Sequence, residues 1–359
     1  MKKVRVAIVG SVRGMCLAQA FMAHKESELV AVCDIREQRA KKAVKPYGDI
    51  KACSDYYDEI LNDDNINAVF IATPDSLHAP MTIAALKAGK HVLSEVPLGT
   101  TVDECKEIIR LSVSANLKVE MGNECRWMPY LEAIKQYIDQ GRLGEIFYGE
   151  GDYMHNLLKD GVNKIEDDDS LHWRWNPDDP MTTMLPGGMH PLDTLRWLMG
   201  VEQFTEVCAF GNRKAIKETD ADDTTAAIFK DKNGIIAKIT STYGVWRPYC
   251  LYFGCYGTEG SFETDRSDNK GEALVYLKDI KYQEKMMSWP VPIWEHPDSS
   301  KYELYHGTTD IHMGFDFIDA IVKDRQPIIS AKEGAISTVA AICALESAKT
   351  GSVVKIPQF

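Results

Sequence analysis

Short apolar runs alternate with helical patterns through the first third of the chain. The runs are continuously apolar, and segments rich in Ala, Lys and Glu separate them; they cover residues 4–9, 29–33, 68–73, 91–95 and 118–121. Continuous apolar strands are typical of a parallel sheet that is covered by helices on both faces. The pattern therefore predicts a doubly wound α/β domain, a Rossmann domain, over residues 1–122.

The pattern changes beyond a predicted helix at residues 130–140. Strand-like runs follow with few helices between them, at residues 145–154, 205–210, 224–230, 235–243, 250–257 and 273–278. Asn233 and Gly234 form a hairpin-turn signal between two of these runs. We expect an α+β domain over residues 123–359 with a large, open, mainly antiparallel sheet. Further helices are predicted at 310–323 and 332–349. Two placements of the last helix and tail stay open: within the second domain, or packed back on the first domain.

Charge and cysteine content narrow the function classes. The formal net charge is −12, which works against nucleic-acid binding. No apolar run is long enough to cross a bilayer, and the basic start leads straight into a strand and a glycine turn, so we expect a cytoplasmic protein. The nine cysteines are an odd number with no CxxC pair; we expect neither a disulfide framework nor a metal site.

A cofactor signal follows the first strand. Gly10 ends that strand, and Asp34 ends the second strand 24 residues later, as in dinucleotide-binding folds, where an acidic residue accepts the ribose hydroxyls. The glycine pattern departs from GxGxxG, because Val12 takes the second glycine position and Gly14 comes one place early. Asp34 favours NAD, while Arg36 leaves NADP open. The alternative is that the glycines only make a tight turn.

Two later strands end in polar motifs. "ATPDSLHA" contains Thr73, Pro74 and His78, and "KHVLSEVP" contains Glu95 and Val96. In an open parallel sheet the carboxyl ends of the strands line the ligand crevice. These side chains are therefore expected to share one wall of a cofactor site.

Together these motifs resemble the Gfo/Idh/MocA family of NAD(P)-dependent sugar oxidoreductases. The resemblance extends through "NECRWMPYLEAIKQYIDQGRLGEI" and "DFIDAIVKDRQP", over essentially the whole chain. It implies hydride exchange between a nicotinamide and a sugar carbon, and an open-faced second domain that often mediates oligomerisation. The expected cofactor-binding set is Gly10, Val12, Arg13, Gly14, Asp34, Arg36, Thr73, Pro74, His78, Glu95, Val96 and Asn123.

The chain departs from the family pattern at two polar positions. The usual Glu-Lys-Pro motif has Val96 in place of its lysine, and Pro186 stands where the family has an aspartate four residues before His190. Family members that are NAD-dependent glycosidases share the Glu-Val-Pro motif and resemble this chain around Tyr153, His155 and Arg174. The tyrosine and histidine of their Tyr-Pro-Thr-His segment, however, fall on Leu185 and Gly188.

Oxidation of a secondary alcohol needs a base for the hydroxyl proton. Because Val96 cannot carry a proton, we assign the general base to His190, although it could instead be a packing residue at a helix start. Tyr153 and His155 share one strand face, which suits a proton relay, a sugar-binding face or an ordinary half-buried strand. The predicted substrate-binding set is Arg126, Tyr153, His155, Arg174, Trp175, His190 and His306.

The first hypothesis is an NAD-dependent oxidoreductase that acts on a ring hydroxyl of a sugar or glycoside. Carbon 3 is the expected position, the product is a 3-oxo-glycoside, and a separate lyase is a potential partner. The alternatives are a redox-neutral NAD-dependent glycoside hydrolase and a non-catalytic sugar or nucleotide sensor. We also expect a homo-oligomer formed through the open sheet.

Overall fold

The computed structural model describes residues 3–157, 182–217, 220–266, 272–278, 284–287 and 308–359. The chain divides into two compact units. The first unit comprises Met1–Trp127 and Pro292–Ala335, and the second comprises Met128–Val291 and Ile336–Phe359. The first boundary thus falls after Trp127, slightly beyond the expected residue 122, because the short helix that follows the last strand of the first sheet stays with that sheet.

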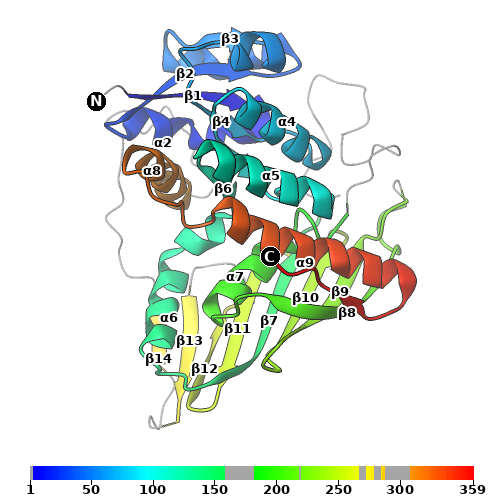
Figure 1. The fold of residues 1–359 in the computed structure, drawn as a ribbon. Coiled ribbons are helices and arrows are strands. Elements are labelled where there is room, and N and C mark those ends of the chain that lie inside the picture. The colour runs from blue at the N-terminus through cyan, green and yellow to red at the C-terminus, as the bar shows by residue number, and fades with distance from the viewer. Residues whose placement is uncertain (1–2, 158–181, 218–219, 267–271, 279–283, 288–307) are drawn as a thin grey trace. The chain divides into compact units, whose positions relative to one another are not determined.

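The first unit contains a six-stranded sheet in the order β3-β2-β1-β4-β5-β6 (Figure 1). Every pairing in it is parallel, which confirms the predicted Rossmann architecture. All four residues of β4 are buried, as expected for a strand that is covered on both faces. The strands are β1 (Val4–Val9), β2 (Ser27–Cys33), β3 (Lys51–Cys53), β4 (Ala68–Ile71), β5 (His91–Glu95) and β6 (Val119–Gly122).

Helices connect these strands and pack against one another. Helix α4 lies against α5, and α2 lies against α8, where a Cβ added at Gly314 would come within 2.5 Å of the Ala20 Cβ. The helices are α1 (Ser11–Gly14), η1 (Met15–Leu17), α2 (Ala18–Ala23), α3 (Glu37–Val44), η2 (Lys45–Tyr47), the π-helix η3 (Tyr56–Leu61), α4 (Asp75–Lys87), α5 (Val102–Ala115), η4 (Glu124–Trp127) and α8 (Thr308–Val322).

The second unit contains a nine-stranded sheet among the described residues, in the order β14-β13-β12-β11-β7-β10-β9-β8-β15. Only β7 and β10 pair in parallel there, which confirms a mainly antiparallel sheet. Asn233 and Gly234 lie in the turn between β9 and β10, and Gly234 has a φ of 90°. The strands are β7 (Ile146–Met154), β8 (Phe204–Asn212), β9 (Thr224–Asp231), β10 (Ile236–Thr242), β11 (Cys250–Gly257), β12 (Gly260–Thr264), β13 (Glu272–Leu277), β14 (Glu284–Met287) and β15 (Val354–Lys355).

Helices α6 (Pro129–Asp139), α7 (Met189–Leu198) and α9 (Ala331–Thr350) complete the described part of this unit. Two glycines of β7 make room for α7, because a Cβ at Gly151 would lie 2.7 Å from the Pro191 Cβ and one at Gly149 would lie 2.5 Å from the Met199 Sδ. The tail pairs with β8 through β15. From Ile336 onward the last helix and tail therefore belong to the second unit, and α8 with the start of α9 belongs to the first.

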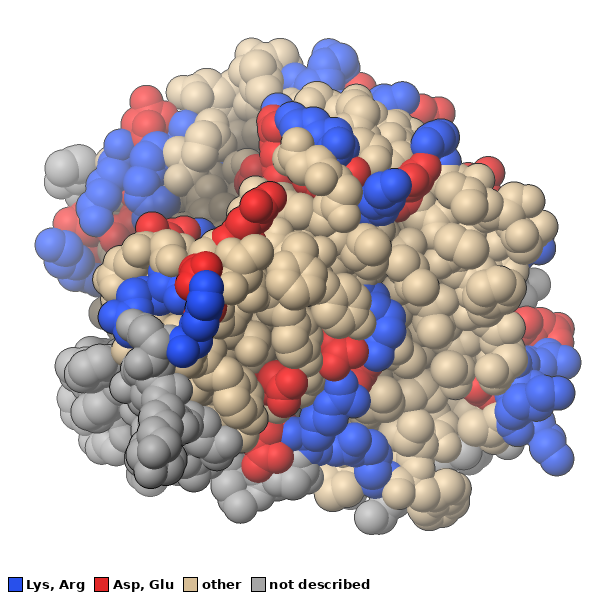
Figure 2. All heavy atoms as spheres, turned by 90° about the horizontal axis from the view of Figure 1, so that it is seen from below, with Lys and Arg blue, Asp and Glu red and all other residues tan. Residues whose placement is uncertain are grey.

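Three further features of the described residues concern surface charge, cysteines and helix length. Acidic and basic side chains are interspersed on the face drawn in Figure 2, with a wide area of other residues between them. All nine cysteines lie in the described ranges; they are free thiols, and all are buried except the half-buried Cys208. None of the helices found in the described ranges is long and apolar enough to span a membrane.

One fully buried acid lies on β6. The Glu120 side chain has 0% exposure, and burial, followed by the nearby Asp316 carboxylate, raises its pKa well above the usual value while Arg325 acts in the opposite direction. Asp316 in turn pairs with Arg325 and accepts a hydrogen bond from the Ile328 amide at 2.8 Å. Glu120 is therefore held as the neutral acid in the fold and is ionised in the unfolded chain.

We expect Glu120→Gln to stabilise the protein increasingly as the pH rises. Above its unfolded pKa, an acid whose pKa is raised on folding destabilises the folded state, because the unfolded chain releases a proton that the folded protein retains. This cost is absent below the unfolded pKa and grows as the pH rises toward the folded pKa. The free energy gained by the variant should grow by about 1.4 kcal/mol per pH unit above pH ~4.5. Urea denaturation at pH 5 and pH 8 measures it. Glu107→Gln, at an exposed pair with Arg110 on α5, is the control, and equal effects of both variants at both pH values would contradict the prediction.

Candidate functional site

The glycine turn brings β1 close to the end of β4. Gly10 has a φ of 91°, and a Cβ there would lie 2.3 Å from the Ala72 carbonyl oxygen. Only glycine fits this backbone. A Cβ at Gly14 would lie 2.5 Å from the Ile8 Cγ2, so this glycine lets α1 pack on β1 one place earlier than in GxGxxG. Val12, at the second glycine position, is 73% exposed.

Asp34 lies at the end of β2 beside this turn. Its Oδ2 accepts hydrogen bonds from the Ser11 amide at 3.0 Å and from the Ser11 hydroxyl at 2.6 Å. Its Oδ1 accepts a hydrogen bond from the Arg36 amide at 3.0 Å. The predicted ribose-binding carboxylate is thus fixed at the carboxyl end of the sheet, as the sequence suggested.

His78 ties the ends of β4 and β5 together. Its side chain is 1% exposed, and its two ring nitrogens lie 2.8 Å from the carbonyl oxygens of Pro97 and Thr73. Pro74, the N-cap of α4, follows Thr73 directly. The structure therefore brings the two predicted motifs into one wall, in which His78 connects the loops.

The end of β5 carries an ion pair and an aliphatic side chain. The Arg13 Nε lies 3.0 Å from the Glu95 Oε1. Burial lowers the pKa of Arg13, but the nearby acidic groups, Glu95 foremost, together outweigh this effect and the pKa is raised, so Arg13 remains a cation. Val96 is 6% exposed, and its peptide bond to Pro97 is cis. A permanent cation therefore pairs with the residue that precedes the usual lysine position of the family, but an arginine cannot give up a proton to serve as a base.

Two predicted residues follow β6. Asn123 is fully buried, and its side-chain oxygen accepts a hydrogen bond from the Cys125 amide at 3.4 Å. Arg126 is 5% exposed, and its guanidinium lies 3.8 Å from the Glu333 carboxylate at the start of α9. This contact anchors η4, and the assignment of Arg126 to sugar binding stays a prediction.

Within the second unit, glycines place the start of α7 against β7. The His190 amide donates to the Gly187 carbonyl oxygen at 3.2 Å. A Cβ at Gly187 would lie 2.8 Å from the Tyr153 Cδ1 and 2.7 Å from the Tyr243 hydroxyl. The absence of a side chain at Gly187 is what allows Tyr153 to lie beside the loop that carries His190.

Tyr153, His155 and His190 form an aromatic cluster. The Tyr153 and His190 rings are stacked, with centroids 5.6 Å apart and an interplanar angle of 13°. The Tyr153 hydroxyl lies 3.2 Å from the His155 Nδ1. All three side chains are half-buried. The structure thus brings together the three residues that the sequence proposed as catalytic.

Tyr249 belongs to this cluster and was missed by sequence reasoning. Its ring meets Tyr153 edge-on at 5.5 Å and His155 edge-on at 5.1 Å between centroids. It lies just before β11, and no motif in the sequence marks it. The register that pairs Leu251 with Tyr153 is the signal that could have placed it near the site.

A buried polar network holds α7, and with it His190. The Ser337 hydroxyl donates to the Asp193 Oδ1 at 2.8 Å, and the Arg196 Nε donates to the Ser337 Oγ at 3.0 Å. Arg196 also donates to the Glu202 carbonyl oxygen at 2.9 Å. Because a buried charge is costly without its partner, this network fixes α7 on α9.

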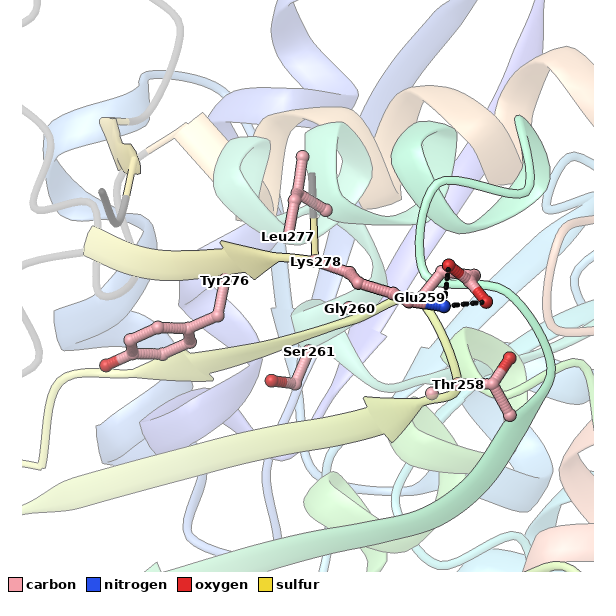
Figure 3. Close-up of a pocket in the computed structure, with 8 residues that line it drawn as sticks. Thr258, Glu259, Gly260, Ser261, Tyr276, Leu277 and Lys278 are labelled. Atoms are coloured by element: carbon pink, nitrogen blue, oxygen red, sulfur yellow. Dashed lines mark hydrogen bonds and ion pairs between the residues drawn. The ribbon is translucent and has the colours of Figure 1, made fainter. Parts of the chain in front are cut away.

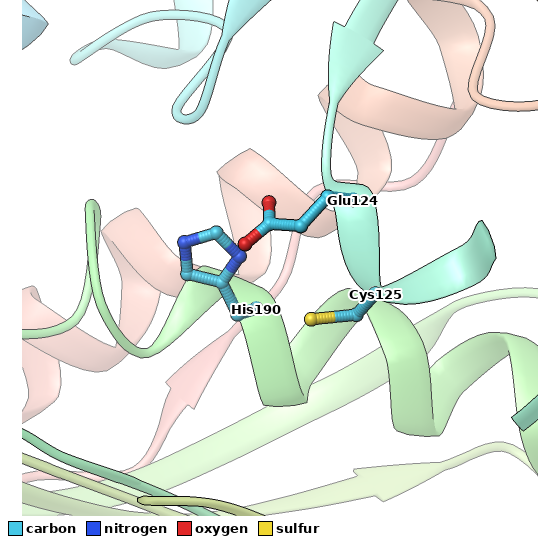
Figure 4. Close-up of side chains that lie close together, drawn as sticks. All are labelled: Glu124, Cys125 and His190. Carbon is cyan, nitrogen blue, oxygen red and sulfur yellow. The ribbon is translucent and has the colours of Figure 1, made fainter. Parts of the chain in front are cut away.

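The remaining predicted substrate-binding residues, Arg174, Trp175 and His306, lie outside the described residues. In Figure 4, Glu124 and Cys125 extend from η4 and His190 extends from the first turn of α7.

A shallow pocket beside the β11–β12 turn is lined by Thr258, Glu259, Tyr276 and Lys278 among others (Figure 3). The Lys278 Nζ lies 3.0 Å from the Glu259 carboxylate in an exposed pair, which is typical of a surface turn.

Two family models match the chain. The oxidoreductase family model "GFO_IDH_MocA", described as an NAD-binding Rossmann fold, matches residues 4–123. The "GFO/IDH/MocA C-terminal domain" model matches residues 131–263. The two models describe the two parts of the same family architecture in the expected order.

Curated relatives and solved structures agree with this match. A levoglucosan dehydrogenase of Pseudarthrobacter phenanthrenivorans is 26% identical, over 91% of this chain and 89% of its own length. An alpha-N-acetylgalactosaminidase of Tannerella forsythia is 24% identical, over 93% of this chain and 81% of its own. The structure of a levoglucosan dehydrogenase in complex with NADH and levoglucosan has the same fold, with a TM-score of 0.86 and 24% identity over 100% of both chains.

Proposed function

Because this chain belongs to the Gfo/Idh/MocA family of oxidoreductases and has its NAD-binding Rossmann domain, we propose that it oxidises a sugar or glycoside with NAD. The proposed position is the hydroxyl at carbon 3, and the product is a 3-oxo-glycoside. One relative that aligns over 91% of this chain is a levoglucosan dehydrogenase, whose name specifies a sugar-derived substrate. A ketone at carbon 3 also acidifies the neighbouring carbon–hydrogen bond, so a separate lyase is a fitting partner for the product.

The observation that carries this proposal is the cluster of Tyr153, His155 and His190. Three groups that can exchange protons or donate hydrogen bonds lie within one aromatic surface. Aromatic faces are suited to the apolar face of a pyranose ring, and imidazole nitrogens are suited to its hydroxyls. Tyr249 extends the same surface, and we include it in the sugar-binding set.

The chemistry divides between cofactor and protein. Bound NAD supplies the carbon that accepts the hydride when the substrate C–H bond breaks. An imidazole nitrogen of His190 takes the hydroxyl proton as the carbonyl forms, because Val96 carries no proton and Arg13 cannot accept one. Stacking on Tyr153 keeps the His190 ring in one orientation. The hydrogen bond between Tyr153 and His155 offers a second proton path along β7.

A redox-neutral glycosidase is the alternative, and it is favoured by relatives such as the Tannerella forsythia enzyme. The local backbone argues against it. In the glycosidase-like register the missing histidine falls on Gly188, where a Cβ would lie 2.4 Å from the Met184 Sδ and 2.9 Å from the Met184 carbonyl oxygen. A side chain there requires the loop to move, so this loop is built for a different set of catalytic groups.

We expect the purified protein to produce NADH from NAD in the presence of a suitable sugar or glycoside. The test panel should include levoglucosan, methyl glycosides and N-acetylgalactosaminides. With one class of these compounds the absorbance of NADH should rise, and mass spectrometry should show a product lighter than the substrate by two hydrogen atoms. Free aglycone or free sugar without net NADH would identify the hydrolase instead. Binding of sugar with neither product would identify a sensor.

His190→Gln should lower kcat by roughly 10²- to 10⁴-fold, because it removes the general base. The dissociation constant for NADH should stay unchanged, since His190 does not belong to the predicted cofactor-binding set. His91→Gln is the matched control: His91 opens β5 at the end opposite Glu95, where its Nδ1 accepts a hydrogen bond from the Lys118 amide. Full turnover by the His190 variant would remove it from the mechanism.

We also propose a homo-oligomer formed through the open sheet of the second unit. The pairing of Cys208 with Ile228 and of Ile228 with Lys238 places Phe210, Ile228 and Ile236 on one face. These three side chains are 70%, 53% and 39% exposed. Exposed apolar side chains gathered on one sheet face are typical of an interface, and a second copy of the chain is the proposed occupant.

Ile228→Lys should therefore weaken the assembly, because it introduces a desolvated charge into the interface. Light scattering after gel filtration should show a lower mass for the variant at micromolar concentration. Val113→Lys, at an exposed site on α5 of the first unit, is the control and should keep the wild-type mass. A monomeric wild-type protein would contradict the proposal.

A further inference from the structure

The contacts of Asp34 point to a selectivity role for Ser11. Ser11 and Asp34 are both buried, at 5% and 7% exposure. The Ser11 hydroxyl and the Ser11 amide both donate to one oxygen, the Asp34 Oδ2, at 2.6 Å and 3.0 Å. In the glycine fingerprint this position accepts any residue, so the motif itself assigns nothing to its side chain.

Counting acceptors shows what this arrangement leaves for a ligand. A carboxylate offers about four lone-pair sites. Ser11 occupies both sites of Oδ2, and the Arg36 amide occupies one site of Oδ1 at 3.0 Å. One acceptor site remains on Oδ1, enough for a single ribose hydroxyl. Three donors also prevent the carboxylate from turning away from that position.

The remaining site distinguishes NADH from NADPH. A ribose hydroxyl can donate to Oδ1, whereas the phosphate that replaces the 2′-hydroxyl in NADPH brings negative charge and no comparable donor. Rejection of the phosphate depends on a carboxylate that cannot rotate. We propose that Ser11 is the positioning residue that holds Asp34 in this orientation and so sets the preference for NAD over NADP.

This inference rests on NAD binding by the first unit and not on the sugar chemistry or on His190. It follows that the Ser11 hydroxyl should affect the two nucleotides unequally. Loss of the hydroxyl frees one site of Oδ2 and leaves the carboxylate held by two backbone amides alone. Asp34 can then turn away from a 2′-phosphate, which weakens the repulsion between them.

The experiment measures dissociation constants of the full-length chain for NADH and NADPH by nicotinamide fluorescence, without sugar. Wild type should bind NADH more tightly. Ser11→Ala should weaken NADH binding, leave NADPH binding equal or stronger, and so reduce the ratio of the two constants at least about fivefold, as expected for loss of a hydrogen bond to a charged group. Ser11→Thr, which keeps the hydroxyl, should retain the wild-type ratio.

A purely structural role for Ser11 predicts a different result. Both nucleotides would then lose affinity by the same factor in Ser11→Ala, and an unchanged ratio overturns the proposal. If Ser11→Ala does not fold, Ser11→Cys provides the same comparison, because a thiol is a weaker donor of similar size. A wild-type protein without preference for NADH also overturns it, whereas failure of the sugar assays alone would leave this result standing.

Discussion

The close approach of β1 to the end of β4 is the constraint on which the first unit depends. It requires a residue without a Cβ at Gly10, because any side chain would enter the Ala72 carbonyl group. With the two strands joined in this way, the chain turns sharply, α1 packs on β1 through Gly14, and the Ser11 amide faces Asp34. In an open parallel sheet, ligands bind in the crevice outside the carboxyl ends of the strands. The positions of Asp34, His78 and Glu95 follow from this geometry.

Glycines have a comparable role in the second unit. Gly151 lets α7 lie directly on β7, and Gly187 lets the Tyr153 ring lie under the loop before α7. As a result, the Tyr153 and His190 rings stack. The buried hydrogen bonds among Asp193, Ser337 and Arg196 fix α7, the helix that carries His190. The same need for close packing leaves no room at Gly188. Backbone spacing thus limits which catalytic groups this loop can present.

The sequence predicted the architecture because its signals are local and strong. Buried parallel strands read as apolar runs, and an Asn-Gly turn marks a hairpin. Three-residue β3 and the two-residue β15 are too short to show a period, and Tyr249 reaches the site only through strand pairing. The burial of Arg126 and its contact with Glu333 likewise depend on packing that sequence patterns do not encode.

The loss of the lysine and the retention of a cation have a joint consequence for acid–base chemistry. Arg13 preserves positive charge beside Glu95, which keeps that carboxylate compensated, yet its guanidinium stays protonated at any working pH. Under the proposed function, electrostatic balance and proton transfer, which one lysine can provide together, are therefore separated in this chain. The first unit retains the balance, and under the proposed function proton transfer passes to the imidazoles of the second. Histidine in general titrates near neutrality, so a histidine base, unlike a lysine base, does not need a strongly lowered pKa. Val96 can therefore remain apolar without a compensating charge around it.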